Sequence, residues 1–244
     1  RGVNAARNAS IQQSRYDWCL ILDSDDCLNK GSISNIAVTV KNNPGYRSYM
    51  FTVDDRIDDM AVLGDRRELT FEDFLLGNID GDFAHLLDRK LLLNHPFNEE
   101  LRIYEGLFFL CFFKEAKHML FVNIVTHSRE RNRNDSVTLT VVRFNDTVIR
   151  RKIMSANIQL ERFGQDYVDA DRNDIIQGLY FEIADNELLL GNYPEAQTAI
   201  VNAGNSLKVK ILKMIILMRS GRLYKWALQR YLSIKHKRPQ RDML

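Results

Sequence analysis

The chain has 244 residues, enough for two small domains that each bury a hydrophobic core. Its residues are 45% hydrophobic and 27% charged, with only four prolines, which is a globular composition and excludes fibrous and disordered classes. The formal charge of +2 hides an asymmetry, because residues 205–244 hold eleven Lys or Arg and one acid, which leaves −8 for residues 1–204. The two halves of the sequence therefore face different partners.

Targeting and redox signals are few. No apolar run approaches the roughly 18 residues that a membrane-spanning helix needs. Cys19, Cys27 and Cys111 stand too far apart for a CxxC motif and lie in apolar segments, which predicts buried thiols in a reducing cytoplasm. The sequence starts at Arg1 with neither Met nor a signal-like region, so we expect the natural protein to begin earlier.

The first predicted elements lead into an acidic turn. Residues 4–14 form an amphipathic helix pattern, and the apolar run 18–22 is typical of a buried parallel strand. After the acidic turn, Ser32 is the expected N-cap of a helix that runs to about residue 42. A second strand is predicted at 46–53, followed by an acidic stretch at 54–59 that we expect to be a solvated loop or strand edge, with cation binding as the alternative.

Strands and helices continue to alternate up to about residue 130. The predicted elements are a short helix at 70–77, a strand at 83–87, a helix at 88–94, a buried helix at 104–117 and a strand at 119–125 that leads into polar residues 127–136. This alternation is typical of α/β layers.

Helical periodicity takes over beyond residue 136. Gly191, followed by Pro194, marks a helix stop and a new helix start, and Gly221 precedes a further helix 30 residues after Gly191. This spacing predicts helical hairpins of a weakly tetratricopeptide-like kind. The expected fold is thus an α/β domain over residues 1–138, followed by an all-α helical-hairpin domain over residues 139–244.

Carboxylates crowd at the end of the first predicted strand, where Asp23, Asp25 and Asp26 follow an apolar run. In open α/β folds, ligands bind beyond the carboxyl ends of the strands. Oxygen ligands of this kind suit Mg²⁺ or Mn²⁺, which would bridge to a diphosphate and neutralise its charge. The alternative to a metal site is a solvated acidic turn. The sequence of the neighbouring segments is needed to decide between these two interpretations.

Four segments around these carboxylates occur in a fixed order. They are Gly2-Val3-Asn4-Ala5-Ala6-Arg7-Asn8, Tyr16-Asp17-Trp18, Leu22-Asp23-Ser24-Asp25-Asp26-Cys27-Leu28 and Gly31-Ser32-Ile33. Together they closely resemble the central stretch of family 2 inverting GT-A glycosyltransferases, a helix and a strand that lead into a metal-binding Asp-x-Asp. The resemblance implies that Asp23 and Asp25 act around the ribose, metal and diphosphate of a nucleotide sugar, with Asp26 as a third carboxylate.

A second resemblance lies further along the chain, where the family has Phe-x-Glu and then Glu-Asp opening a buried helix. Here Phe97-Asn98-Glu99 precedes Tyr104-Glu105. The resemblance implies that Glu105 is the general base, and a carboxylate suits this role because the acceptor hydroxyl loses its proton only as the new bond forms. The sequence departs from the family at both positions, since Tyr104 replaces Glu and Glu105 replaces Asp. An ordinary helix-start acid is the alternative role of Glu105.

The polar residues from 127 to 138 resemble the family loop that follows the sheet. The resemblance implies that Arg129 and Arg131 clamp the diphosphate leaving group, for which guanidinium geometry is suited. It also implies that His127 completes the metal site, with a packing or surface histidine as the alternative. His85 is expected to be a half-buried structural histidine.

The family's nucleobase-binding strand and early Asp do not precede Arg1. The resemblance covers residues 1 to about 138, so we expect this chain by itself to bind nucleotide poorly. Two other functions remain open. A haloacid-dehalogenase-type phosphatase would use Asp23 as nucleophile and Asp25 as acid, although Cys27 stands where that family has Thr or Val. A non-catalytic interaction module would instead work through its helical hairpins, supported by a degenerate α/β half.

The expected function is metal-assisted transfer of a sugar, with inversion, from a nucleotide-diphosphate sugar to a saccharide or lipid-linked acceptor. The donor is expected to be a UDP-sugar. Cationic residues of the segment 205–244 are interleaved with apolar ones, which predicts one of two roles for this segment. It either lies on an anionic membrane surface, at the inner face of the membrane, or forms a packed helical domain with a solvated basic face. Few aromatic residues are placed to stack on bases, so nucleic acid is not an expected partner.

Overall fold

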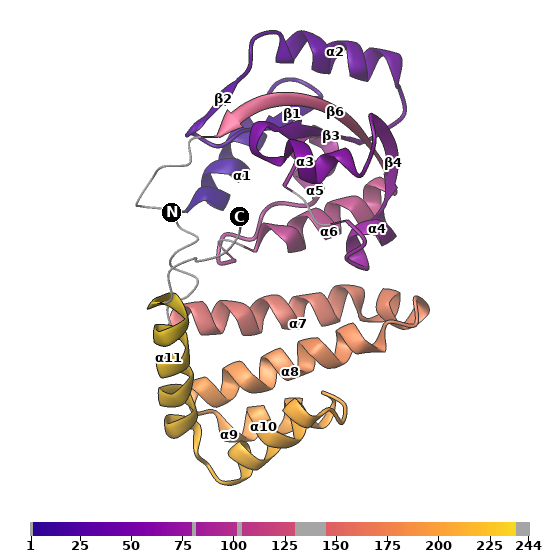
Figure 1. Cartoon of the computed structure of the whole chain (residues 1–244). Helices are drawn as coiled ribbons and strands as arrows, with labels where there is room; N and C mark the ends of the chain where they lie inside the picture. Colours follow the sequence, from indigo (N-terminus) through magenta and orange to yellow (C-terminus); the bar gives the residue numbers. More distant parts are fainter. Residues whose placement is uncertain (1, 80–81, 102–103, 130–144, 238–244) are drawn as a thin grey trace. The chain divides into compact units, whose positions relative to one another are not determined.

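The computed structural model describes residues 2–79, 82–101, 104–129 and 145–237, the last seven of these by their backbone alone. The chain divides into two compact units, Arg1–Ser136 and Val137–Leu244. The first unit is a sheet with helices and the second is helical (Figure 1). The predicted fold class is therefore confirmed. The predicted domain boundary at residues 138 and 139 lies outside the described residues.

The first unit is built on a six-stranded mixed sheet. Its strands are β1 (Trp18–Ile21), β2 (Asp26–Leu28), β3 (Ser48–Val53), β4 (Arg66–Thr70), β5 (Ala84–Asp88) and β6 (His118–Arg129). The strand order is β1-β5-β3-β6-β2, and β4 pairs with the first half of β6. Only β3 and β6 pair in parallel, and the other described pairs are antiparallel.

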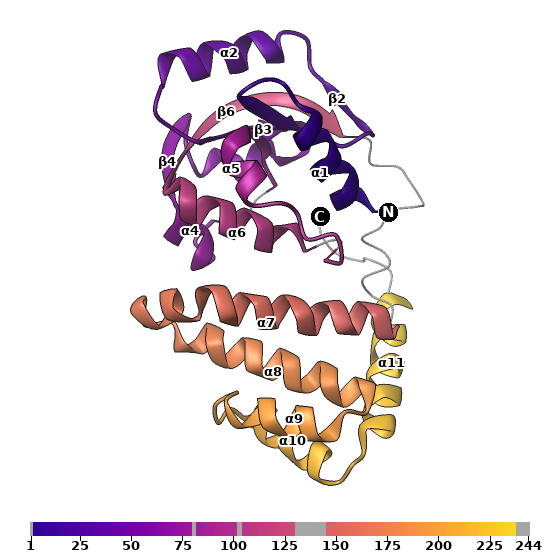
Figure 2. The same cartoon turned by 180° about the vertical axis from the view of Figure 1, so that it is seen from behind.

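Two layers of helices cover this sheet. The helical elements of the unit are α1 (Val3–Gln13), α2 (Ser32–Asn42), η1 (Asp54–Arg56), α3 (Ile57–Ala61), α4 (Phe71–Leu75), α5 (Arg89–Asn94) and α6 (Glu105–Ala116). Helix α2 lies on one face of the sheet, and α4, α5 and α6 lie on the other (Figures 1 and 2). Because both faces are covered, every residue of β3 is buried.

Hydrophobic residues of the central strands alternate between the two layers. Tyr49, Phe51 and Val53 of β3 form one core cluster with Ile36 of α2. On the opposite face, the buried aromatic side chains of α6 dominate, and Phe113 is 1% exposed. The period of two in β3 follows from strand geometry, which sends successive side chains to opposite faces.

Several elements of this unit differ from the sequence prediction. The segment 18–22 was expected to be a buried parallel strand, but β1 is half-buried and pairs antiparallel with β5. The stretch 54–59 is not a loop, because η1 and α3 form there and Met60 anchors α3 with 1% exposure. The N-cap of α2 is Gly31 in a left-handed conformation, which leaves the Ser32 hydroxyl to donate to the carbonyl of Thr126 at 2.6 Å. The strand β4 was not predicted at all.

The second unit consists of helical hairpins, as predicted. Its helices are α7 (Asp146–Asp169), α8 (Asn173–Leu190), α9 (Tyr193–Val201), α10 (Leu207–Leu217) and α11 (Gly221–Lys237). Gly191 ends α8 in a left-handed conformation, and Pro194 stands in the first turn of α9. The Tyr193 hydroxyl donates to the carbonyl of Arg219, which ties the start of α9 to the turn before α11.

Two further sequence expectations are settled by the described residues. None of their helices is long and apolar enough to cross a membrane. The three cysteines are free, but only two are partly buried, since Cys27 is exposed. Cys27 is exposed and not buried as predicted, because it lies in β2, a three-residue strand that pairs within the described sheet with β6 alone.

Candidate functional site

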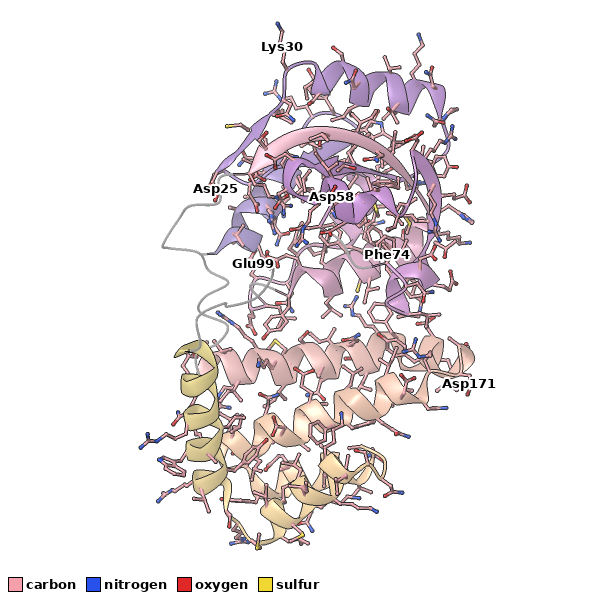
Figure 3. The ribbon with its side chains drawn as sticks, viewed as in Figure 1. Asp25, Lys30, Asp58, Phe74, Glu99 and Asp171 are labelled. Carbon is pink, nitrogen blue, oxygen red and sulfur yellow. The ribbon has the colours of Figure 1, made fainter. Side chains whose placement is uncertain are left out.

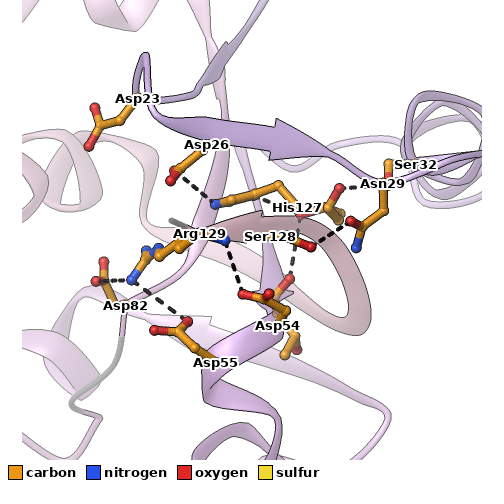
Figure 4. A network of polar contacts seen from close by, with 12 residues as sticks. Asp23, Asp26, Asn29, Ser32, Asp54, Asp55, Asp82, His127, Ser128 and Arg129 are labelled. Carbon is orange, nitrogen blue, oxygen red and sulfur yellow. Dashed lines mark hydrogen bonds and ion pairs between the residues drawn. The ribbon is translucent and has the colours of Figure 1, made fainter. Parts of the chain in front are cut away.

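The ends of five strands meet at one edge of the sheet. Strand pairing places Ile21 beside His85, Val53 beside His127, and Asp26 beside Arg129. Strands β1, β3 and β6 therefore end where β2 and β5 begin. The polar side chains that follow or open these strands gather there, namely Asp23, Asp26, Asp54, Asp55, Asp82, His127 and Arg129 (Figure 4).

Arg7 of α1 connects two of the predicted site residues. Its guanidinium nitrogens lie 2.7 Å from an oxygen of Asp23 and 3.2 Å from an oxygen of Glu105. The Arg7 side chain is only 18% exposed, and its guanidinium carbon lies 5.4 Å from the centre of the Phe97 ring. Because Glu105 opens α6 and Asp23 lies between β1 and β2, one arginine joins the Asp-x-Asp turn to the proposed base.

Two asparagines on the same helix hold the loop that leads toward α6. Asn4 donates to the carbonyl of Asn98 at 2.8 Å. Asn8 pairs with the backbone of Phe97 in both directions, since its amide donates to the carbonyl and its oxygen accepts from the N–H, each at 2.9 Å. Asn4, Arg7 and Asn8 are spaced three and four apart and so share one face of α1. The first and the later matching segments of the sequence are therefore in direct contact.

Asp26 and His127 form the closest carboxylate–imidazole pair of the site, with 3.4 Å between the Asp26 oxygen and Nε2 of His127. Burial lowers the pKa of His127, and Asp26 opposes this only in part, so the ring is neutral at pH 7. Burial also raises the pKa of Asp26, and the charges of Asp23 and Asp25 act in the same direction. His127 lies in the buried part of β6 and not in a loop as predicted.

Arg129, the last residue of β6, lies among carboxylates. Its guanidinium is 2.5 Å from Asp82 and 3.9 Å from Asp55, and its backbone N–H donates to Asp54 at 3.2 Å (Figure 4). Burial raises the pKa of Asp82, but the hydrogen bond and charge of Arg129 outweigh this and hold the pKa below its usual value. Arg129 is therefore fixed at the strand ends by acids from η1, which follows β3, and from the segment before β5.

His85 lies on β5 and is 9% exposed, which is more buried than predicted. Its ring stacks on Phe109 of α6 with 4.1 Å between ring centres. Burial lowers the pKa of His85 to about 3, so the ring is neutral, and the positive charges of Arg129 and Arg7 act in the same direction. The charges of both arginines therefore act on the same buried ring.

Asp26 and His127 fit a divalent cation. Nε2 of His127 can bind a metal in the tautomer whose Nδ1–H donates to Thr126 Oγ1, 3.3 Å away, while the Thr126 hydroxyl donates to the carbonyl of Thr52. Such an outer hydrogen bond orients metal-binding histidines. Within the described ranges, no three His, Cys, Asp or Glu side chains cluster closely enough to hold a metal ion. Mg²⁺ is often bound by only one or two carboxylates when a substrate phosphate supplies further oxygens, and Asp26 is such a carboxylate.

The predicted site residues thus fall in two adjoining groups. Asp23 and Glu105 meet at Arg7, and Asp26 and His127 lie beside Arg129. Asp25 is half-buried in the turn between β1 and β2 (Figure 3), and Arg131 lies outside the described residues. Sequence reasoning assigned no role to Arg7, although its spacing from Asn4 and Asn8 was a usable signal. It also missed Asp82, for which the sequence carries no local signal.

Comparison with known proteins gives a partial match to a glucosyltransferase. No protein-family model matches the chain. The chain is 26% identical over 148 residues to the GalNAc(5)-diNAcBac-PP-undecaprenol beta-1,3-glucosyltransferase of Campylobacter jejuni, a match that covers 57% of this chain and 46% of that protein. The chain therefore spans about half the length of the curated relative that it matches.

Solved structures give the fold. Two crystal structures of S. aureus TarS residues 1–349, one in complex with UDP-GlcNAc, are similar with TM-scores of 0.57 and 0.56 at 14% identity. The matches cover 98% and 100% of this chain and 73% and 74% of TarS. The chain has the fold of TarS. Together with the C. jejuni glucosyltransferase, this likeness supports a glycosyltransferase-type fold.

Proposed function

We propose that this chain carries the catalytic part of an inverting GT-A glycosyltransferase, which transfers a sugar from a nucleotide-diphosphate sugar to a saccharide or lipid-linked acceptor. The observation that carries the proposal is the bridge from Asp23 through Arg7 to Glu105. It joins the turn expected to hold the donor diphosphate to the acid expected to receive the acceptor proton. In support, TarS was crystallised with UDP-GlcNAc, and the name of the C. jejuni relative includes a PP-undecaprenol-linked saccharide.

The charge of the site supports a role for a metal. Ion pairs and hydrogen bonds at and beside the strand ends involve six carboxylates and two guanidinium groups, namely Asp23, Asp26, Asp54, Asp55, Asp82, Glu105, Arg7 and Arg129. A diphosphate would add further negative charge to a region already rich in it, and like charges at short range repel. Asp25, Asp26 and His127 would hold the Mg²⁺ or Mn²⁺ ion that compensates for this charge, and the ion would stabilise the leaving diphosphate.

The chain's own residues then have distinct tasks. The acceptor oxygen forms a bond to the anomeric carbon as the bond from that carbon to the diphosphate oxygen breaks, and the diphosphate leaves with the electron pair. Glu105 takes the proton of the acceptor hydroxyl during this attack. Arg7 fixes the orientation of the Glu105 carboxylate through the 3.2 Å contact. Attack from the face opposite the leaving group inverts the anomeric centre.

Calorimetric titration of the full-length protein with UDP, with and without Mn²⁺, tests the proposal, and transfer from UDP-GlcNAc to a saccharide acceptor is measured in parallel. Binding that requires the metal is the expected result. If UDP does not bind at millimolar concentration with Mn²⁺ present, and no sugar is transferred, the non-catalytic interaction module is the better account of this fold.

A further inference from the structure

Helix α10 exposes an apolar stripe on its outer face. Leu207, Ile211, Met214 and the C-cap residue Met218 are each more than half exposed. Their spacing of four, three and four residues places them on one side of a helix with 3.6 residues per turn. The inner side is formed by Val209, Leu212 and Ile216, which are all buried. The helix is thus anchored in the core of the second unit and still presents apolar side chains to solvent.

Lysines border this stripe. At 3.6 residues per turn, Lys208 lies on one side of the stripe, and Lys210 and Lys213 lie on the other. Lys208 and Lys210 are exposed and Lys213 is half-buried. Lysine stems can pack along apolar surface while their ammonium groups reach a charged layer. A stripe of this kind with lysine on both sides matches the layered chemistry of a lipid headgroup region, which is anionic outside and apolar beneath.

We propose that the outer face of α10 lies on an anionic lipid membrane. Charge complementarity is the argument for this occupant, because residues 205–230 contain seven Lys or Arg and no acid. A second copy of the chain is a poorer fit. In a symmetric dimer the same patch of each copy forms the interface, so the lysines of the two copies would face and repel each other.

The next helix has the same composition. Leu223 and Trp226 of α11 are more than half exposed, and the guanidinium carbon of Arg230 lies 5.7 Å from the centre of the Trp226 ring. Exposed tryptophan and arginine are the residue types that favour the membrane–water interface. Exposed apolar and cationic side chains are therefore found on the neighbouring helix as well.

Co-sedimentation of the full chain with lipid vesicles tests the proposal in the absence of any sugar donor, so its outcome is independent of the proposed function. Vesicles of phosphatidylcholine alone are compared with vesicles that contain phosphatidylserine, at low and at high salt. Binding only to the anionic vesicles, weakened by salt, is expected. Absence of binding to them at low salt would overturn the proposal.

Matched variants separate the stripe from general charge. Each lysine near an anionic surface raises binding about fivefold, so a triple change of Lys208, Lys210 and Lys213 to Gln is expected to weaken it on the order of 100-fold. A control triple change of Lys30, Lys41 and Lys90 to Gln removes the same charge from exposed positions of the first unit and is expected to leave binding within about threefold. Equal effects of the two triple variants would contradict the assignment to α10.

The apolar part is tested with Ile211→Ser and Met214→Ser combined, since both side chains are more than half exposed and the buried side of α10 is unchanged. A loss of vesicle binding of at least about tenfold is expected. Analytical ultracentrifugation of the same variant tests whether a second copy of the chain covers the stripe in place of a membrane. If the unmodified chain is a dimer that this variant dissociates, a second copy covers the stripe and the membrane proposal is wrong.

Discussion

Replacing Arg7 by Met tests how the site is assembled. The hydrogen bond to Glu105, whose side chain is 25% exposed, contributes about 1.5–3 kcal/mol as a bond to a charged group. The contact to Asp23, which is 52% exposed, contributes at most about 1 kcal/mol. Against these gains, Nε of Arg7 is buried and has no hydrogen-bond partner among the described residues, a cost of about 1–3 kcal/mol that the variant relieves. With the middle of each range, the free energy of unfolding of the first unit should therefore fall by about 1 kcal/mol.

The assay has to report on the first unit alone. The chain has two tryptophans, Trp18 in the first unit and Trp226 in the second, so a Trp226→Phe background makes urea unfolding visible through Trp18. Double-mutant cycles then isolate each pair. We expect a coupling energy of about 1 kcal/mol or more between Arg7 and Glu105, measured with Glu105→Gln, and a smaller one between Arg7 and Asp23, measured with Asp23→Asn. Arg15→Met, at an exposed position just after α1, is the control.

A zero coupling energy between Arg7 and Glu105 would refute this account of the site, because the structure assigns most of the interaction to that pair. Equal effects of Arg7→Met and Arg15→Met would refute it as well. Arg7→Lys gives a further check, since a single ammonium lacks the planar fork that reaches two carboxylates. It should retain part of the stability and lose most of the coupling to one of the two acids.

Three other predictions concern the chemistry and the pH dependence. Glu105→Gln should lower kcat by a factor on the order of 10²–10⁴ with little change in nucleotide-sugar affinity, as expected when only a general base is lost, whereas Glu72→Gln at an exposed position should have no effect. A retained rate would move the base to Glu99 or Glu100. Asp25→Ala should abolish metal-dependent UDP binding by calorimetry together with transfer, while Asp58→Ala, an exposed acid, should retain both, and normal turnover of Asp25→Ala would remove the Asp-x-Asp assignment. The pKa of His85 is about 3 in the folded state and 6.5 in the unfolded state. Between these values the unfolded chain binds more protons, so the free energy of unfolding is highest above pH 6.5 and declines as the pH falls toward 3. Urea unfolding at pH 7 and pH 5 should show a loss of about 2 kcal/mol that His85→Phe lacks, and an equal loss in both proteins would show that other groups cause it.

Local sequence patterns were sufficient where one element decides its own structure. The β3 strand, the α2 helix and the turn from α8 to α9 follow from apolar alternation, helical periodicity and the Gly191 cap. Polar residues were wrongly predicted to end a strand where their side chains are buried and hydrogen-bonded. The prediction ended the last strand at residue 125, yet β6 continues because Thr126 and His127 are buried and hydrogen-bonded.

The pairs that build the site could not be predicted from local patterns. Arg7 meets Glu105 across 98 positions, and Arg129 meets Asp82 across 47. No periodicity links such residues, since only the strand order brings the ends of β1, β3 and β6 to one edge. The segment match placed Asp23 and Glu105 in the same family pattern, but it gave neither the guanidinium between them nor the acids around Arg129.

The sequence departs from the family pattern at Tyr104 and Glu105, where α6 begins, and the position of this helix start depends on contacts made by other residues. Asn4 and Asn8 hold the preceding loop mainly by its backbone, at Asn98 and Phe97, and Asn8 also donates to the Glu99 carboxylate at 3.2 Å. The Phe97 ring in turn stacks on Phe108 with 3.6 Å between ring centres, which fixes the first turns of α6 beneath the loop. The position of the helix start therefore depends on α1 and on aromatic packing. The longer side chain of Glu105 is accommodated because the guanidinium of Arg7, which lies on α1, binds its carboxylate.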